Sequence, residues 1–323
     1  MSVSSFPGDL RAGVHGRFAV RAHRDDSDAQ TLNNQVMRML DLATSRHLEF
    51  ERDCLSDPWC IAEHWRKEVR VERVDSITEQ VLNRSGSVVD DDGHGVIGLF
   101  SPAPDRRWKD RIQVQFKGAY DARSNFTLLH EIGHCIQQND DALATTLSVV
   151  GSQNGSRNLE EAACNRFASL ALLPDSYVTG MLQGKPVDAV AVNRLFDSGR
   201  SWRYRSVRVS RPVVARRMAD FLQCPGTVTL LQGGLRGDRR VEEARFDDCD
   251  MSVRTHADGA AEYDGALTDL ERDMLERLRK GEGKPQSHEF AKPDGTCVHA
   301  SIAESRGRYL SYFIVIKEEP SRS

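Results

Sequence analysis

The chain has 323 residues, of which 39% are hydrophobic and 28% are charged, and its formal net charge is −4. This length and composition are typical of a globular protein with two domains, and the near-balanced charge gives no overall attraction to nucleic acid or to a membrane surface. Because no apolar run could span a membrane or serve as a secretory signal, and the seven cysteines are scattered, we expect a cytoplasmic protein without disulfides or a membrane partner.

The first part of the chain predicts a tail followed by helices. Residues 1–27 are rich in Ser, Gly, Arg and Asp, which is typical of a mobile segment. Apolar residues recur at helical spacing between residues 31 and 51, and Asp57 followed by Pro58 favours the start of a second helix. Further on, residues 112–116 alternate strictly between apolar and polar types, which predicts a half-buried strand.

The most informative motif is His130-Glu131-Ile132-Gly133-His134, an HExxH sequence. The apolar residues around it follow a helical period, so we expect the motif on an amphipathic helix with both histidines on one face. There, His130 and His134 can bind one metal ion, typically zinc, and Glu131 can act as general base on an activated water. Gly133 would let another backbone approach closely. A surface helix whose histidines bind nothing is the alternative for an isolated motif.

A second amphipathic helix, over residues 159–174, offers a third metal ligand. Glu161 lies near its start, and Asn165 lies one turn later on the same face. Glu161 could therefore bind the ion while Asn165 orients a ligating histidine. A carboxylate at this place also stabilises the helix dipole without any metal. Glu160 points about 100° away and is expected in solvent, and Cys164, among small apolar residues, is expected to be buried rather than a ligand.

These two segments, residues 125–134 and 161–174, resemble the ImmA/IrrE-type zinc metallopeptidases in order and spacing. The resemblance covers roughly residues 60–220. It implies a zincin-like metallopeptidase core in which His130, His134 and Glu161 bind Zn2+ and Glu131 is the catalytic base. It also implies an endopeptidase that cleaves a helix-turn-helix transcriptional repressor, which would switch on a stress-response, mobile-element or phage-defence operon.

An arginine-rich segment follows the second helix. Seven arginines lie within residues 200–217, with Trp202 and Tyr204 among them. Since arginines neutralise phosphates and aromatic rings stack on bases, this segment could bind single-stranded DNA as an activator. The residues proposed for this contact are Trp202, Arg203, Tyr204, Arg205 and Arg208. A solvated charged surface is the favoured alternative, because most runs of charged residues lie on the protein surface.

The sequence pattern of the chain changes after residue 222. Strand-like segments near residues 227–231, 299–302 and 308–316 flank a helical segment at 267–278, which predicts a small α+β domain over residues 223–323. The resemblance suggests that this domain is GAF- or PAS-like and sensory. The expected fold class is therefore α+β, with a helical N-terminal part, a zincin-like metallopeptidase domain over residues 28–222, and a second, smaller α+β domain.

Two other functions remain open at this point. The chain could be a regulator that binds nucleic acid or protein and holds a non-catalytic zinc, although a structural site should be closed by a fourth ligand. It could also be a general peptidase that acts on small peptides.

Overall fold

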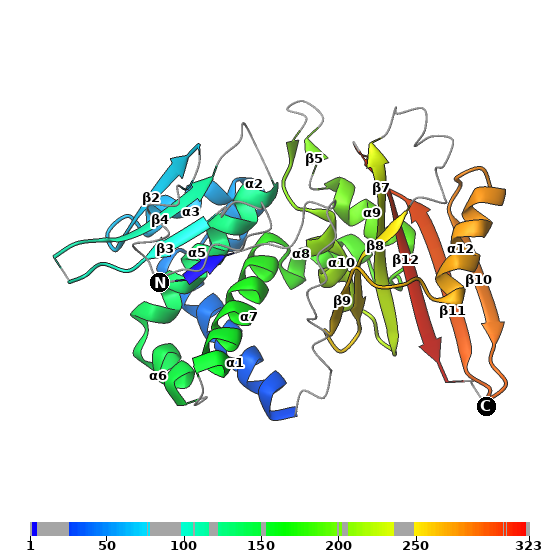
Figure 1. The fold of residues 1–323 in the computed structure, drawn as a ribbon, viewed down its shortest axis with the longest axis horizontal. Helices are drawn as coiled ribbons and strands as arrows, with labels where there is room; N and C mark the ends of the chain where they lie inside the picture. Colours follow the sequence, from blue (N-terminus) through cyan, green and yellow to red (C-terminus); the bar gives the residue numbers. More distant parts are fainter. Residues whose placement is uncertain are drawn as a thin grey trace. The chain divides into compact units, whose positions relative to one another are not determined.

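The computed structural model describes residues 2–4, 26–75, 77, 98–105, 107–115, 122–149, 153–198, 200–201, 206–235, 249–305, 307 and 309–320. The chain forms two compact units (Figure 1). The first comprises Met1–Pro174 and Ser201–Val209, and the second comprises Asp175–Arg200 and Ser210–Ser323. Most of the tail predicted over residues 1–27 lies outside the described residues. The predicted α+β fold class is confirmed.

A four-stranded sheet forms one layer of the first unit, in the order β1-β3-β4-β2. Its strands are β1 (Ser2–Ser4), β2 (Val69–Val74), β3 (Gly98–Ser101) and β4 (Asp110–Gln115). β2 runs parallel to β4, whereas β3 is antiparallel to both β4 and β1. The strand predicted over residues 112–116 is thus confirmed as β4, apart from Phe116, which lies outside the described residues.

The first unit also contains helices (Figure 1). They are α1 (Asp26–Arg46), α2 (Phe50–Ser56), α3 (Ile61–His64), α5 (Ala122–Asn139), α6 (Asp141–Val149) and α7 (Gln153–Leu172), with a 3-10 turn, η1 (Pro58–Cys60). The predicted start at Asp57 is confirmed, since its side chain accepts a 3.0 Å hydrogen bond from the backbone N–H of Trp59. α5 packs between β3 and β4 on one side and α7 on another, so most of its length is buried.

The second unit is built on a six-stranded antiparallel sheet in the order β10-β11-β12-β7-β8-β9. Its strands are β7 (Gly226–Leu235), β8 (Asp250–His256), β9 (Ala261–Tyr263), β10 (Gln286–Ala291), β11 (Cys297–Glu304) and β12 (Tyr309–Glu319). Outside both sheets, two short strands, β5 (Arg200–Ser201) and β6 (Ser206–Val207), pair with each other, and β6 belongs to the first unit.

Helices contact both faces of the six-stranded sheet. They are α8 (Asp175–Leu182), α9 (Ala189–Ser198), α10 (Arg211–Ala219) and α12 (Asp269–Lys280). Met274 and Leu278 of α12 pack into a core that includes Ile302 of β11. The backbone N–H of Ala189 in α9 donates to the Ser301 hydroxyl, whose side chain points to the opposite face because neighbouring strand residues alternate.

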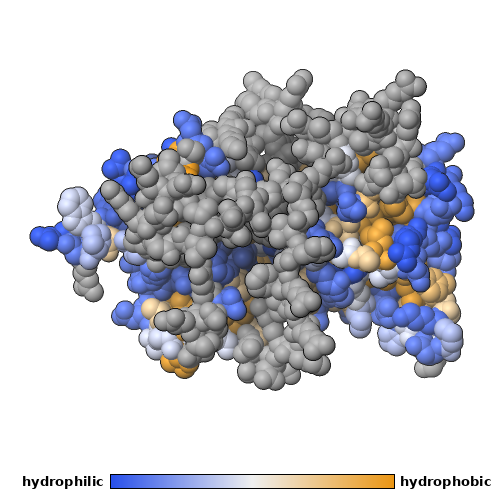
Figure 2. All heavy atoms as spheres, in the orientation of Figure 1, coloured by the Kyte–Doolittle hydropathy of each residue, from blue (hydrophilic) through white to orange (hydrophobic). Residues whose placement is uncertain are grey.

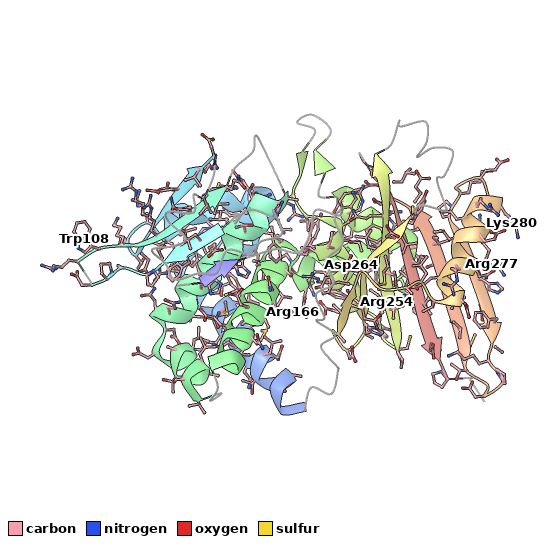
Figure 3. The ribbon with its side chains drawn as sticks, viewed as in Figure 1. Trp108, Arg166, Arg254, Asp264, Arg277 and Lys280 are labelled. Carbon is pink, nitrogen blue, oxygen red and sulfur yellow. The ribbon has the colours of Figure 1, made fainter. Side chains whose placement is uncertain are left out.

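An ion pair is buried beneath α12. Glu271, fully buried, accepts a 2.9 Å hydrogen bond from Nε of Arg254 and a 2.7 Å bond from the Thr229 hydroxyl (Arg254 is labelled in Figure 3). Thr268 caps the helix by exchanging hydrogen bonds with Glu271. Because the charge is paired and both carboxylate oxygens accept hydrogen bonds, Glu271 fixes α12 to the sheet and does not weaken the core.

The two units divide the chain earlier than the sequence predicted. We expected a boundary near residue 222. The longer segment of the first unit instead ends at Pro174, so α8, α9 and α10 belong to the second unit. α9 contacts β11 and β12, and α10 contacts β7 and β8. The sequence could not show this, because the apolar stripe of a helix does not reveal which core receives it.

Apolar side chains are gathered inside each unit. On the face drawn in Figure 2, the described surface residues are mostly hydrophilic, with smaller hydrophobic areas between them. Among the described residues, the large hydrophobic side chains that remain exposed are scattered, and Leu48 and Trp108 are two of them. None of the described helices is long and apolar enough to cross a membrane.

Candidate metal centre

The HExxH motif lies in the buried middle of α5, as its helical period predicts. His130 and His134 are 1% and 0% exposed. Gly133 between them lies against α7: a Cβ at this position would stand 3.1 Å from Sγ and 3.4 Å from Cα of Cys164. The predicted close approach of a second backbone is therefore confirmed, and it places the middle of α7 beside the two histidines.

Two imidazoles and one carboxylate meet at this point. Nε2 of His130 and Nε2 of His134 are 3.1 Å apart. The Glu161 carboxylate lies 3.3 Å from the first nitrogen and 3.7 Å from the second. Ligands held at about 2.0–2.1 Å from a tetrahedral zinc ion are about 3.3 Å apart, so His130, His134 and Glu161 fit such an ion with little movement.

The second ring nitrogen of each histidine also has a partner on α7. Nδ1 of His130 lies 3.1 Å from Oδ1 of Asn165. Nδ1 of His134 lies 2.9 Å from Oε1 of Glu160. Partners of this kind fix the orientation and tautomer of an imidazole, so that both Nε2 atoms are presented to the same point.

Glu160 corrects one sequence-based expectation. We expected this side chain in solvent, but only 19% of it is exposed and it pairs with His134. The 100° offset from Glu161 was right, yet α5 and α7 are so close that this direction also meets an imidazole. A histidine in an HExxH motif needs a partner for its second nitrogen, and the adjacent acidic pair was the signal that could have identified it.

The charges of the site favour a cation. Burial would raise the pKa of Glu161, but hydrogen bonds to His130 and His134 lower it to about 2. Burial would lower the pKa of His134, but the Cys164 thiol and the two carboxylates raise it. For His130, burial prevails and lowers the pKa. Together, Glu160 and Glu161 stabilise positive charge at the centre of the cluster.

Glu131 is the buried carboxyl beside this cluster. It is 0% exposed, and neither of its carboxylate oxygens has a hydrogen-bond partner within the described part of the chain. Burial raises its pKa to about 8, although the charge of His134 lowers it in part. Gly98 of β3 leaves the room for it, since a Cβ there would stand 2.5 Å from Oε1 of Glu131. An unsatisfied carboxyl of this kind is suited to exchanging a proton with a small ligand.

Arg208 does not lie on an exposed basic surface. Its side chain is buried at 6% exposure, and Nη1 donates a 2.6 Å hydrogen bond to the carbonyl oxygen of Leu172. The carbonyl of Arg208 in turn accepts a bond from the Asn125 amide at 3.2 Å. The predicted contact of Arg208 with DNA is therefore wrong, because its guanidinium completes the C-terminal end of α7.

Two other arginines of this segment bind side chains of the second unit. Arg217 is buried and pairs with Asp175 and Asp220, while Arg211 contacts the Ser305 hydroxyl at 2.9 Å. These arginines bind parts of their own unit. Four of the predicted DNA contacts lie outside the described residues: Trp202, Arg203, Tyr204 and Arg205.

Comparisons with known proteins show only a distant likeness in structure. No family model matches the chain, and no curated protein matches it. Among solved structures, the chain is similar to a Mycobacterium tuberculosis transcriptional regulator with a TM-score of 0.46 and 12% sequence identity, over 90% of each chain. This likeness is too distant to transfer a function.

Proposed function

We propose that the chain is a zinc-dependent endopeptidase, with the ion held by His130, His134 and Glu161 and with Glu131 as general base. The observation that supports this most strongly is the meeting of three ligand atoms from α5 and α7 at tetrahedral spacing. The partners already placed on both remaining imidazole nitrogens add to it, because they hold the ligands in position before an ion arrives.

The proposed chemistry divides between the ion and the buried carboxylate. When bound, zinc would lower the pKa of a water molecule and polarise a peptide carbonyl. Glu131 would accept a proton from the attacking water and pass it to the leaving amine. Its buried position suits both transfers, because its raised pKa keeps a proton bound long enough to be donated. A nearby cation would bring that pKa down toward neutrality.

The number of ligands favours a catalytic ion over a structural one. The group in the described part of the chain contains three potential ligands, the number typical of catalytic zinc, whereas structural zinc is usually closed by a fourth. Cys164 could serve as a fourth ligand, but its sulfur already accepts a 3.0 Å hydrogen bond from the Gln137 amide and packs against Gly133.

The edge of the first sheet suits an extended substrate. β1 pairs antiparallel with β3, with Val3 opposite Leu99, and β1 also contacts α5. A three-residue strand can thus lie on β3 beside the helix that carries Glu131. Peptides often bind by adding a strand to such an edge. We propose that the scissile segment of a substrate takes this position on β3 in place of β1.

The proposed substrate is a helix-turn-helix transcriptional repressor, and its cleavage would release a stress-response, mobile-element or phage-defence operon. This part rests on the resemblance to the ImmA/IrrE-type peptidases. Stimulation by single-stranded DNA is also proposed, through Trp202, Arg203, Tyr204 and Arg205, without Arg208. Salt-dependent retention of single-stranded DNA that is lost on reversing Arg203 and Arg205 to Glu would support it.

The decisive experiment combines metal analysis with a cleavage assay. The wild-type chain and Glu131→Gln should both carry zinc, and the variant should cleave the repressor encoded nearest its gene at least about 100-fold more slowly. Glu63→Gln, on an exposed side chain of the same unit, is the matched control and should cleave normally. Zinc-loaded wild-type protein that cleaves neither this repressor nor small peptides would favour the non-catalytic regulator instead.

A further inference from the structure

Three potential ligands of different types lie together on the second unit. β10 and β11 are adjacent antiparallel strands, in which Glu289 stands directly opposite His299. Cys297 lies two residues before His299 on the same strand, so all three side chains point to one face of the sheet. One ligand atom from each lies within 4.8 Å of the other two. None of these residues belongs to the centre on α5 and α7.

The distances within this cluster match those around a bound ion. Sγ of Cys297 lies 3.5 Å from Nε2 of His299 and 3.3 Å from Oε1 of Glu289. In a tetrahedral zinc site, a sulfur at about 2.3 Å and a nitrogen at about 2.0–2.1 Å from the ion are about 3.6 Å apart. Cysteine, histidine and glutamate are all common zinc ligands, and the strand register holds them together without an ion.

A nucleophilic cysteine explains this arrangement less well. The hydrogen bond to Glu289 raises the pKa of the Cys297 thiol, and the negative charge of Glu319 on β12 raises it further. A nucleophile needs the opposite shift. A divalent cation would reverse the effect, because it neutralises the carboxylates and displaces the thiol proton to solvent.

The neighbouring basic groups leave the cluster acidic. Lys292 is paired with Glu318 at 2.8 Å. Lys317 stands opposite His299 on β12, and its charge lowers the pKa of Cys224, whereas the charges that act on Cys297 are those of Glu289 and Glu319.

We propose that Glu289, Cys297 and His299 form a second zinc site on the surface of the sheet. The side chains of Glu289 and His299 are 66% and 33% exposed, so an ion can reach them from solvent and keep a fourth position for water or another ligand. A site at the edge of this unit gives it a means of responding to metal independently of the peptidase centre.

Cobalt(II) substitution tests the proposal with a signal that the three proposed ligands of the first centre do not give. A bound thiolate produces a sulfur-to-cobalt charge-transfer band, whereas His130, His134 and Glu161 contain no sulfur. The full-length chain loaded with cobalt should show this band, and Cys297→Ser and His299→Ala should lose it together with one of the bound ions. Circular dichroism should confirm that both variants remain folded.

Matched controls separate this site from Cys224 and from the centre on α5 and α7. Cys224→Ser changes a similarly half-buried cysteine beside the same Glu319 and should keep the band. His130→Ala should also keep it while losing the other ion, so a failure of the peptidase proposal would not affect this result. A wild-type chain without the band at saturating cobalt, or a band that persists in folded Cys297→Ser, would overturn the second site.

Discussion

Replacing Glu160 by alanine tests how the centre on α5 is assembled. The carboxylate accepts the hydrogen bond from Nδ1 of His134 at 2.9 Å, and it does so in a place where little of its side chain meets water. Without it, the imidazole of His134 can rotate or change tautomer, and a ligand that was held ready must be ordered at the cost of binding energy.

The expected loss follows from comparable outer partners of metal-bound histidines. Removing one typically weakens metal binding by about 10–100-fold, which corresponds to about 1.4–2.7 kcal/mol. Because only 19% of the Glu160 side chain is exposed, water is poorly placed to replace it, and we expect the upper part of this range. Asn165→Ala should cause a similar loss through His130, and Glu161→Ala a larger one, since it removes a ligand.

Zinc affinity can be measured by competition with a chromophoric chelator at constant pH. Glu63→Ala removes a carboxylate from the same unit that is 75% exposed, and its affinity should equal that of the wild type. An unchanged affinity in folded Glu160→Ala would refute the reasoning, because the bond to His134 would then contribute nothing to holding the ligand.

Two further predictions concern stability. Gly98→Ala should destabilise the chain by about 1–3 kcal/mol in urea unfolding, because its Cβ would stand 2.5 Å from a carboxylate oxygen of Glu131, whereas Gly180→Ala, with nothing within 4 Å, should be neutral or slightly stabilising. Glu271→Gln should cost about 3–5 kcal/mol by breaking a buried ion pair, whereas Glu276→Gln, on a half-exposed side chain of the same helix, should cause little change. Although burial opposes it, hydrogen bonding lowers the pKa of Glu271 in the folded chain, so this contribution is present above the unfolded-state pKa of about 4.3 and lost as the pH falls. The wild type should therefore lose stability in acid more steeply than Glu271→Gln, and parallel pH profiles would contradict the assignment.

Local patterns were sufficient for the elements that carry the centre. The helical period around His130 and His134 predicted α5, and residues 112–116 predicted most of β4, because both signals depend on the spacing of apolar residues along one element. The requirement for a small residue at Gly133 could also be predicted, since a glycine inside a helix lowers its stability and calls for a packing reason.

The positions of α9 and Arg208 depended on the assembled chain. The apolar stripe of α9 was visible as a pattern, but nothing in it indicated that it packs on β11 and β12 of the second unit. Arg208 belongs to a run of charge that sequence alone assigns to the surface. It is buried because a carbonyl at the end of α7 needs a donor, and that need exists only where the two segments meet.

The side-chain pairs around the proposed ion also depend partly on the sequence of one helix and partly on how two helices pack. Spacing within one helix places His130 and His134 on one face and separates Glu160 from Glu161 by a known angle, because helix geometry is fixed by the backbone. Which carboxylate then faces which imidazole depends on the distance and rotation between α5 and α7. Those are set by the contact of Gly133 with Cys164, where side-chain volume controls how closely two backbones approach.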